Sequence, residues 1–283
     1  MGGAGLRHRQ APAYRRLGDA VAATRGRVTR AERFRADLAD LTAHWRAPIP
    51  RAQPLWPLGL ALCVPAVAFL ADVSLLFDER VARCARALPR DVVDFFQIVT
   101  RFGESHWLFA LSVLVFAGAW FARASAVARR ARAASGLLAA RALYVFTVLA
   151  DSGLLSQALK HPIGRARPAL LDKVGPHHFE FFSTPSIYAS FPSGHTITAF
   201  ATAAALTPFL PRRLRPLPWL AALAIAVSRP IVGAHYPSDV LGGALIGMAC
   251  AYLTALAFAR RKIAFSVAPD SFRPEARGLR LRP

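Results

Sequence analysis

Long apolar runs separated by arginine-rich links constrain the fold of this chain most strongly. Hydrophobic residues make up 54% of the 283 residues, and the mean hydropathy of +0.34 is high for a soluble domain. A helix that crosses a hydrocarbon core of about 30 Å needs roughly 20 residues. The sequence therefore predicts an all-α integral membrane protein, a bundle of six transmembrane helices. The predicted spans are Leu55–Phe77, Trp107–Phe121, Gly136–Leu159, Thr196–Leu210, Leu217–Val232 and Val240–Ala259.

The basic residues distinguish a membrane protein from a nucleic-acid binder. The formal net charge is +20, with 36 Lys and Arg residues. The most basic segments are residues 1–50, the links 122–135 and 211–216, and the tail that begins at Arg260. All four lie on one side of a six-span chain, and the positive-inside rule places that side in the cytoplasm. This alternation favours a multi-pass protein of a bacterial inner membrane with both termini in the cytoplasm, and it argues against nucleic acid as a partner.

The chain divides into three predicted parts. Residues 1–50 form a basic cytoplasmic arm. Within this arm, residues 14–46 are compatible with an amphipathic helix on anionic lipid or with a solvated helix or disordered segment. Residues 51–262 form the six-span membrane domain. Residues 263–283 carry proline, glycine and scattered charge, and they are predicted to be a disordered cytoplasmic tail.

Three polar clusters lie at the opposite, non-cytoplasmic ends of the predicted spans. KHPIGRARP (residues 160–168) ends the third span, PSGH (192–195) opens the fourth, and SRPIVGAHYPSD (228–239) joins the fifth to the sixth. The fourth and fifth spans form a hairpin, which returns the third cluster to the face that holds the other two. The combined set has several cations, two imidazoles and one carboxylate, as an anion site would. Its members are Lys160, Arg165, Arg167, His195, Arg229, His235 and Asp239.

The PSGH cluster adds backbone groups to this anion site. If a helix begins near Ser193, its first N–H groups have no intrahelical partners, and the helix dipole adds partial positive charge there. Such helix starts bind phosphate readily. Gly194 allows an anion to approach the backbone closely, and His195 then stands beside it.

The three clusters resemble the signature of the type 2 phosphatidic acid phosphatase (PAP2) family, which is related to haloperoxidases. That signature reads K-x6-RP, then PSGH, then SR-x5-H-x3-D. The matching residues here are Lys160 with Arg167-Pro168, Pro192 to His195, and Ser228-Arg229 with His235 and Asp239. The resemblance covers roughly residues 101–259. It implies a bacterial membrane lipid phosphatase with its active site at the non-cytoplasmic ends of the helices.

The resemblance also implies a role for each residue. His235 attacks phosphorus and forms a phosphohistidine, Asp239 orients His235, and His195 protonates the leaving oxygen and then activates water. The implied phosphate ligands are Lys160, Arg167, Ser193, Gly194 and Arg229. The role of Arg165 stays open, because Arg167 could do the same task.

No cofactor and no metal are expected, because the cations already present can do what magnesium does at other phosphoryl-transfer sites. Cys63, Cys84 and Cys250 do not have the spacing of a metal site or a disulfide framework. The predicted function is therefore a metal-independent lipid phosphate or diphosphate phosphatase on the periplasmic side. The alternatives are a lipid-to-lipid phosphotransferase with the same site and a non-enzymatic membrane transporter.

Several points stay open at the level of sequence. The substrate could be phosphatidylglycerol phosphate, phosphatidic acid, undecaprenyl diphosphate or a lipid A phosphate, and the oligomeric state is not indicated. Asp151 lies inside the third predicted span, where an internal structural hydrogen bond is favoured over catalysis. Glu104 either lines the site or caps the second span.

Overall fold

The computed structural model describes residues 56–268 and 271–278 and, nearer the N-terminus, Thr29, Glu32, Arg35, Ala36, Ala39 and Ala43. Met1–Arg46 and Ala47–Pro283 form separate compact units. In the first unit, the Thr29 N–H donates to Glu32 Oε2 (2.7 Å) and the Glu32 N–H donates to Thr29 Oγ1 (3.2 Å), a capping box at a helix start. The rest of the predicted basic arm lies outside the described residues.

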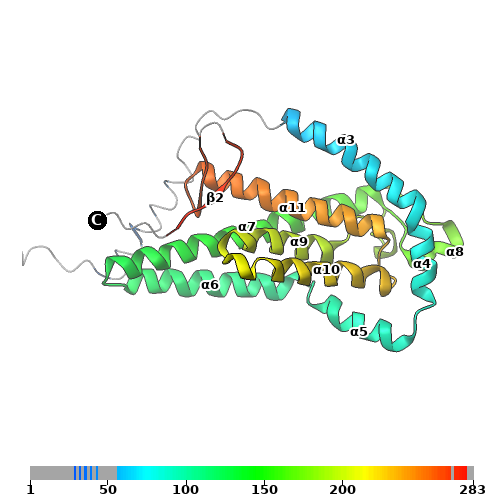
Figure 1. Ribbon diagram of the computed structural model, residues 1–283, viewed down its shortest axis with the longest axis horizontal. Helices are drawn as coiled ribbons and strands as arrows, with labels where there is room; N and C mark the ends of the chain where they lie inside the picture. The colour runs from blue at the N-terminus through cyan, green and yellow to red at the C-terminus, as the bar shows by residue number, and fades with distance from the viewer. Residues whose placement is uncertain are drawn as a thin grey trace, which may run out of the picture. The chain divides into compact units, whose positions relative to one another are not determined.

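In its described residues the second unit is mainly helical, with one short antiparallel pair of strands (Figure 1). Its α-helices are α3 (Trp56–Val73), α4 (Glu79–Arg86), α5 (Arg90–Arg101), α6 (Ser105–Ser125), α7 (Arg129–Ile163), α8 (Leu171–Val174), α9 (Gly194–Leu206), α10 (Pro216–Ile231) and α11 (Pro237–Arg260). Short turns of other helix types are η1 (Ser74–Asp78), η2 (Pro168–Leu170), η3 (Ser186–Tyr188), η4 (Thr207–Phe209) and η5 (Arg212–Leu214). The strands β1 (Phe265–Ser266) and β2 (Glu275–Ala276) pair antiparallel.

Four helical stretches in the described part are long and apolar enough to cross a membrane. They are Ala61–Arg86, Arg90–Ser125, Arg129–Ile163 and Pro237–Arg260. Helices α9 and α10 match the fourth and fifth predicted spans, but their 13 and 16 residues reach only about 20 and 24 Å. All six predicted apolar segments are helical, but only four of the described helical stretches have the length and apolar character of a full crossing. Segment 78–106, expected as a link, also contains α4 and α5.

Helix α9 lies at the centre of the bundle, in contact with α7, α10 and α11 (Figure 1). Two glycines of α11 allow the closest of these approaches. A Cβ at Gly243 would lie 2.8 Å from Ser193 O, and a Cβ at Gly247 would lie 2.5 Å from Ile197 O. Small residues let the backbones of membrane helices approach in this way. The start of α9 is thereby held against the start of α11, where the PSGH cluster meets Asp239.

The tail after α11 is ordered in its described part. Phe265 is fully buried, and its ring packs edge-on against Tyr144 with centroids 4.8 Å apart. Phe265 belongs to β1, which pairs antiparallel with β2. The expectation that residues 263–283 are disordered is therefore wrong for 263–268 and 271–278, because Phe265 completes the core between α7 and α11.

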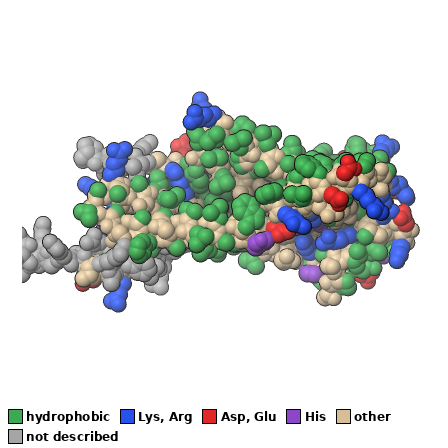
Figure 2. Space-filling model, turned by 90° about the horizontal axis from the view of Figure 1, so that it is seen from below, with side chains coloured by type: hydrophobic (Ala, Val, Ile, Leu, Met, Phe, Trp, Pro, Cys, Tyr) green, Lys and Arg blue, Asp and Glu red, His purple; other side chains and the backbone are tan. Residues whose placement is uncertain are grey.

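Large apolar side chains face outward along the bundle. Val64 (72% exposed), Leu114 (69%) and Leu154 (71%) lie on three different helices. Figure 2 shows hydrophobic side chains over the middle of one face and charged side chains gathered toward one end. An apolar outer surface on a helical bundle suits contact with lipid tails.

Candidate active site

Helix α7 ends in the first polar cluster because Gly164 takes a left-handed conformation, with φ of 59°. Its N–H donates to Lys160 O over 2.9 Å, the pattern of a helix C-terminus capped by glycine. A Cβ at this position would lie 1.7 Å from Glu180 O, so only glycine fits. The turn keeps Lys160 in the last turn of α7 and sends residues 165–167 back across the end of the bundle.

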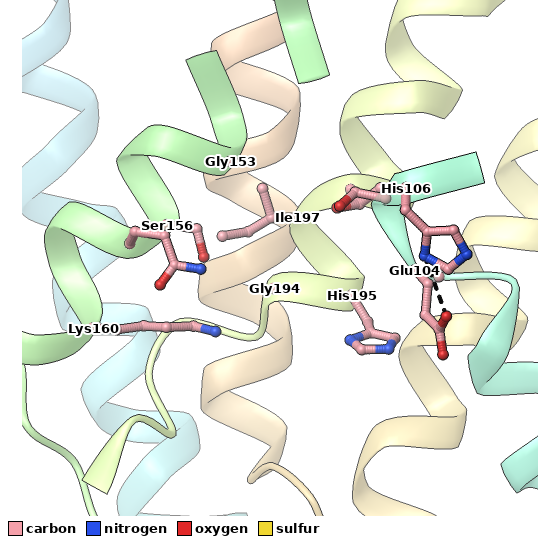
Figure 3. A pocket seen from close by; sticks show the side chains of 12 residues that line it. Glu104, His106, Gly153, Ser156, Lys160, Gly194, His195 and Ile197 are labelled. Carbon is pink, nitrogen blue, oxygen red and sulfur yellow. Dashed lines mark ion pairs between the residues drawn. The ribbon is translucent and has the colours of Figure 1, made fainter. Parts of the chain in front are cut away.

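Helix α9 begins at Gly194, as the sequence predicted. A Cβ at Gly194 would lie 3.3 Å from Lys160 Nζ, so the ammonium group lies against this helix start (Figure 3). The Ser193 N–H donates to Asp239 O (3.1 Å) and is therefore already occupied. Of the two predicted phosphate ligands Ser193 and Gly194, Ser193 therefore has no free backbone amide to offer a phosphate. The amides of the first helical residues, from Gly194 onward, have no intrahelical acceptor.

His235, between α10 and α11, is held in one tautomer. Its Nδ1 lies 2.7 Å from Ser190 O. A carbonyl oxygen only accepts hydrogen bonds, so Nδ1 carries the proton and Nε2 keeps a free lone pair. Burial lowers the pKa of His235 to about 4, against the opposing effect of Asp239, and the positive charges of Arg229 and Arg167 lower it further. The ring is therefore neutral at pH 7.

Asp239 orients His235 through an intermediary. Its Oδ2 lies 3.8 Å from His235 Nδ1, which is beyond hydrogen-bond length. The same oxygen accepts from Ser190 Oγ (2.6 Å) and from the Tyr236 N–H (2.9 Å). Asp239 therefore contacts His235 through Ser190 rather than by a direct hydrogen bond. Asp239 fixes Ser190, and the carbonyl of Ser190 fixes the imidazole.

A buried ionic network, made of Asp78, Arg165, Ser238 and Asp239, lies behind His235. Arg165 Nη1 donates to Asp239 Oδ1 (2.6 Å), and its Nη2 donates to Asp78 Oδ2 (2.7 Å). The Arg165 side chain is 3% exposed and both carboxylates are 0% exposed. Asp78 also accepts from the N–H (3.0 Å) and the Oγ (2.5 Å) of Ser238. This settles the open role of Arg165: its guanidinium is used within the protein.

A cation ring, made of Lys160, Arg167 and Arg229, lies in front of the imidazoles. Arg167 is anchored by donating from Nε to Ser186 O over 2.9 Å. Arg229 donates from Nη1 to Thr100 Oγ1. Arg229 Nε is buried and has no hydrogen-bond partner among the described residues, so it is available to a ligand.

His195 joins this group. It lies close enough to all three cations of the ring and to His235 to interact with them electrostatically. A Cβ at Gly103 would lie 3.0 Å from the His195 ring, so the break between α5 and α6 packs directly against it. The structure thus gathers the two histidines and the cation ring at one end of the bundle. Arg165 and Asp239 stand behind them.

Two acids outside the signature also have defined surroundings. Asp151 accepts a hydrogen bond from Thr254 Oγ1 (2.9 Å), the internal bond that the sequence favoured, and this links α7 to α11. Glu104 precedes α6, lies 3.4 Å from His106 Nδ1, and lines a pocket together with His195 (Figure 3). Glu104 is the N-cap residue of α6, but its side chain makes no capping hydrogen bond, so of the two alternatives the structure supports the one in which Glu104 lines the site.

Sequence reasoning missed Asp78, Ser190 and Ser238. The sequence contained one indication that Asp78 is paired: it ends an apolar run, where an acid is costly unless it has a partner. Ser190 acts mainly through its backbone carbonyl, which no residue pattern reveals. Among the described residues there is no group of three or more His, Cys, Asp and Glu side chains placed to hold a metal ion.

These features are those of a class of helical membrane protein in which lysine, arginine and a neutral imidazole surround one site. Residues 140–263 match the family described as the PAP2 superfamily. The chain belongs to this superfamily, as the resemblance predicted, and is a multi-pass membrane phosphatase that hydrolyses lipid phosphates.

Individual relatives cover most of the chain. The lipid A 1-phosphatase of Rhizobium etli is 36% identical over 217 residues, which are 77% of this chain and 91% of that protein. Phosphatidylglycerophosphatase B of Bacillus subtilis is 29% identical over 210 residues, or 69% of this chain and 90% of the relative. The crystal structure of a transmembrane PAP2 type phosphatidylglycerolphosphate phosphatase from Bacillus subtilis aligns with a TM-score of 0.49 and 24% identity, over 69% of this chain and 92% of that one.

Proposed function

We propose that this protein is a metal-independent lipid phosphate phosphatase that works through a phosphohistidine at His235. One observation carries the proposal: His235 Nδ1 donates to Ser190 O over 2.7 Å, which leaves Nε2 unprotonated. A neutral imidazole fixed in this tautomer is a competent nucleophile. Simple anion binding would need no such tautomer, and a protonated ring would serve it better.

The reaction has two steps that share His195. In the first, His235 Nε2 forms a P–N bond while the P–O bond to the lipid breaks, and His195 gives a proton to the leaving oxygen. In the second, the now neutral His195 takes a proton from water, and the water oxygen attacks phosphorus and breaks the P–N bond. Inorganic phosphate leaves, and both imidazoles return to their initial protonation states.

The cation ring is proposed to hold the phosphoryl oxygens through both steps. Lys160, Arg167 and Arg229 offset the charge that develops on these oxygens, with help from the Gly194 amide and the Ser193 hydroxyl. This predicts full activity in excess chelator and inhibition by vanadate, which mimics the trigonal-bipyramidal phosphorus. Activity that is lost in chelator and restored by magnesium would contradict the metal-independent mechanism.

Trapping the intermediate tests the proposal most directly. Brief mixing with a ³²P-labelled lipid phosphate, followed by denaturation in alkali, should leave label on His235 that is stable in base and released by acid. His235→Ala should lose the label and at least about 10⁴-fold of kcat while the lipid still binds. Label that survives in His235→Ala, or that is stable in acid, would place the covalent step elsewhere.

Two other functions remain testable with the same protein. A lipid-to-lipid phosphotransferase would release little inorganic phosphate when water is the sole acceptor, whereas the phosphatase releases it stoichiometrically. A transporter would keep its function in His235→Ala. We favour the phosphatase because the relay from Asp239 through Ser190 to His235 serves nucleophilic attack.

For the substrate, we propose a phosphorylated glycolipid of the lipid A type. The support is the 36% identity to a protein described as a lipid A 1-phosphatase, over 91% of its length. Phosphatidylglycerol phosphate, phosphatidic acid and undecaprenyl diphosphate are the comparison substrates. Release of phosphate from each, measured with the same purified protein, ranks them.

We also propose that six helices cross the membrane and that the site faces the periplasm. His235 precedes the N-terminal end of α11. The arginine-rich links 122–135 and 211–216 follow the C-terminal ends of α6 and α9, and Arg260 and Arg261 lie at the C-terminal end of α11. The positive-inside rule places these ends in the cytoplasm. A reporter fused near Lys173 should read periplasmic and one near Arg213 cytoplasmic. The reverse result would move the chemistry to the cytoplasmic face.

A further inference from the structure

A polar pocket of about 460 Å³ opens beside Lys160 and His195. It is lined by the break between α5 and α6, by one face of α7 and by the start of α9 (Figure 3). Lys160 and His195 belong to its wall, whereas His235 does not. The pocket is therefore continuous with the phosphate site and lies on the His195 side of it. Its volume is within the range of small-molecule sites, about 300–1,000 Å³.

Several polar groups in this pocket have no role in the proposed reaction. Ser156 is 3% exposed, and its Oγ has no hydrogen-bond partner among the described residues. A buried hydroxyl without a partner costs about 1–3 kcal/mol, so a ligand atom that bonds to it would recover that free energy. Gln157, on the same wall, offers two donors and one acceptor, and Glu104 offers a carboxylate.

The pocket also contains unoccupied space on α7. Gly153 lines it, and a Cβ there would meet no atom within 4 Å. One helical turn toward the site, Ser156 Oγ would lie 3.7 Å from a Cβ at Gly194, the residue that starts α9. The free hydroxyl therefore stands directly beside the phosphate position, while the space at Gly153 lies farther from it.

The direction of the reaction determines what this pocket can hold. His195 gives its proton to the leaving oxygen, so the leaving group must lie on the His195 side of phosphorus. His235 attacks from the opposite side, because the attacking and leaving atoms of phosphoryl transfer lie roughly in line. The polar pocket is the space on the His195 side.

From this placement we propose that the pocket is the leaving-group subsite and that it binds an uncharged, hydroxyl- and amide-bearing sugar head. This inference rests on the proposed function. The Ser156 hydroxyl and the Gln157 amide would bond to sugar groups next to the cleaved oxygen. The Glu104 carboxylate would disfavour a second phosphate in the same place, so a sugar phosphate monoester would be preferred to a lipid diphosphate. The glycerol of phosphatidate would leave these groups unpaired.

Substrate selectivity in pocket variants tests the proposal. The three substrates are a glucosamine-disaccharide lipid 1-phosphate, phosphatidate with matched acyl chains, and a polyprenyl diphosphate. Gln157→Leu and Gly153→Leu should each lower kcat/KM for the glycolipid about tenfold or more, and change that for phosphatidate by less than about threefold. Ser156→Ala should act in the same direction. Glu104→Gln should raise kcat/KM for the diphosphate relative to the wild type.

Matched controls lie outside the pocket, one on α7 and one on α6. Ser152→Ala removes a buried hydroxyl that already donates to Leu149 O (3.2 Å), and Gly118→Leu adds a side chain where no atom lies within 4 Å of the Cβ position. Both should leave the selectivity unchanged. Thermal unfolding in detergent checks each variant for folding, and Gln157→Leu keeps the test valid if Gly153→Leu does not fold.

The outcomes separate this inference from the proposed function. Equal losses on all three lipids, or no loss on the glycolipid, would overturn the leaving-group subsite even if ³²P label still appears on His235. Absence of the label in the wild-type protein would overturn the phosphohistidine mechanism itself. Selective loss on the glycolipid with label retained on His235 would support both.

Discussion

The buried ionic network behind His235 and the cation ring in front of it both depend on arginine, yet they use it in opposite ways. Arg165 is 3% exposed and bonds to two carboxylates. Arg167, two residues later, donates to a backbone carbonyl that carries no net charge. The partners of a cation, rather than its proximity to the site, therefore decide whether its charge is available to a substrate.

Replacement of Arg165 should give the largest effect on stability. Arg165→Met leaves Asp78 and Asp239 buried without their cation, which typically costs about 3–5 kcal/mol in the free energy of unfolding. Arg167→Met is the matched control, because Arg167 neutralises no acid and should change that free energy by less than about 1 kcal/mol. Chemical unfolding in mixed micelles measures both. Equal destabilisation by the two variants would remove the distinction between network and ring.

Replacement of Arg229 should give the largest effect on catalysis without a matching loss of stability. Arg229→Ala removes a donor whose Nε has no protein partner in the described part of the chain. Loss of one such donor to developing charge costs about 10²–10³ in kcat, or about 3–4 kcal/mol. Steady-state release of phosphate measures it. A rise in KM with unchanged kcat would show instead that Arg229 binds ground state and transition state equally.

Ser190 connects the two regions, and its replacement should have an intermediate effect. Ser190→Ala removes a hydrogen bond to Asp239 Oδ2 but keeps the carbonyl that holds His235. The expected loss of stability is about 1–3 kcal/mol, with a smaller loss of kcat than in Arg229→Ala. Ser190→Thr, which keeps a hydroxyl, should recover part of it. A loss of kcat as large as that of Arg229→Ala would mean that the hydroxyl itself takes part in the reaction.

The smallest expected effect concerns the protonation of His235. Its pKa of about 4 lies below the ordinary value for histidine because burial disfavours the charged ring. His235 should therefore stay neutral as the pH falls from 7 to about 5 and gain a proton only near pH 4. In Arg229→Ala the pKa should rise, because a nearby positive charge is removed. Titration by ¹⁵N-histidine NMR measures both; a value of 6 or above in the wild type would contradict the neutral, buried nucleophile.

The sequence predicted the cation ring better than the network behind it. Lys160, Arg167 and Arg229 belong to motifs with fixed internal spacing, and the ends of three helices bring them together. The bond from Arg165 to Asp78 joins residues 87 positions apart, and no periodicity within either segment indicates that pairing. Hydropathy located the apolar helices but not their lengths, since η4 and the prolines around it shorten α9 relative to α7.

The conformation of the long link between α7 and α9 was also beyond sequence reasoning. It is set by isolated backbone bonds, such as Ser190 N–H to Arg165 O (3.0 Å) and Ala166 N–H to His178 O (3.0 Å). Such bonds depend on backbone position rather than on residue type. No residue pattern indicated that a carbonyl of this link would select the tautomer of His235.

The location of Asp78 has a consequence for how much of this chain makes a working enzyme. Asp78 precedes the segment that matches the family, residues 140–263, by more than sixty positions. A shortened protein that begins at Glu79 would keep every signature residue and still leave Arg165 with one counter-ion instead of two. The segment formed by α3 and η1 would then be more than a membrane anchor, because Asp78, the last residue of η1, supplies one of the two counter-ions of Arg165 behind His235.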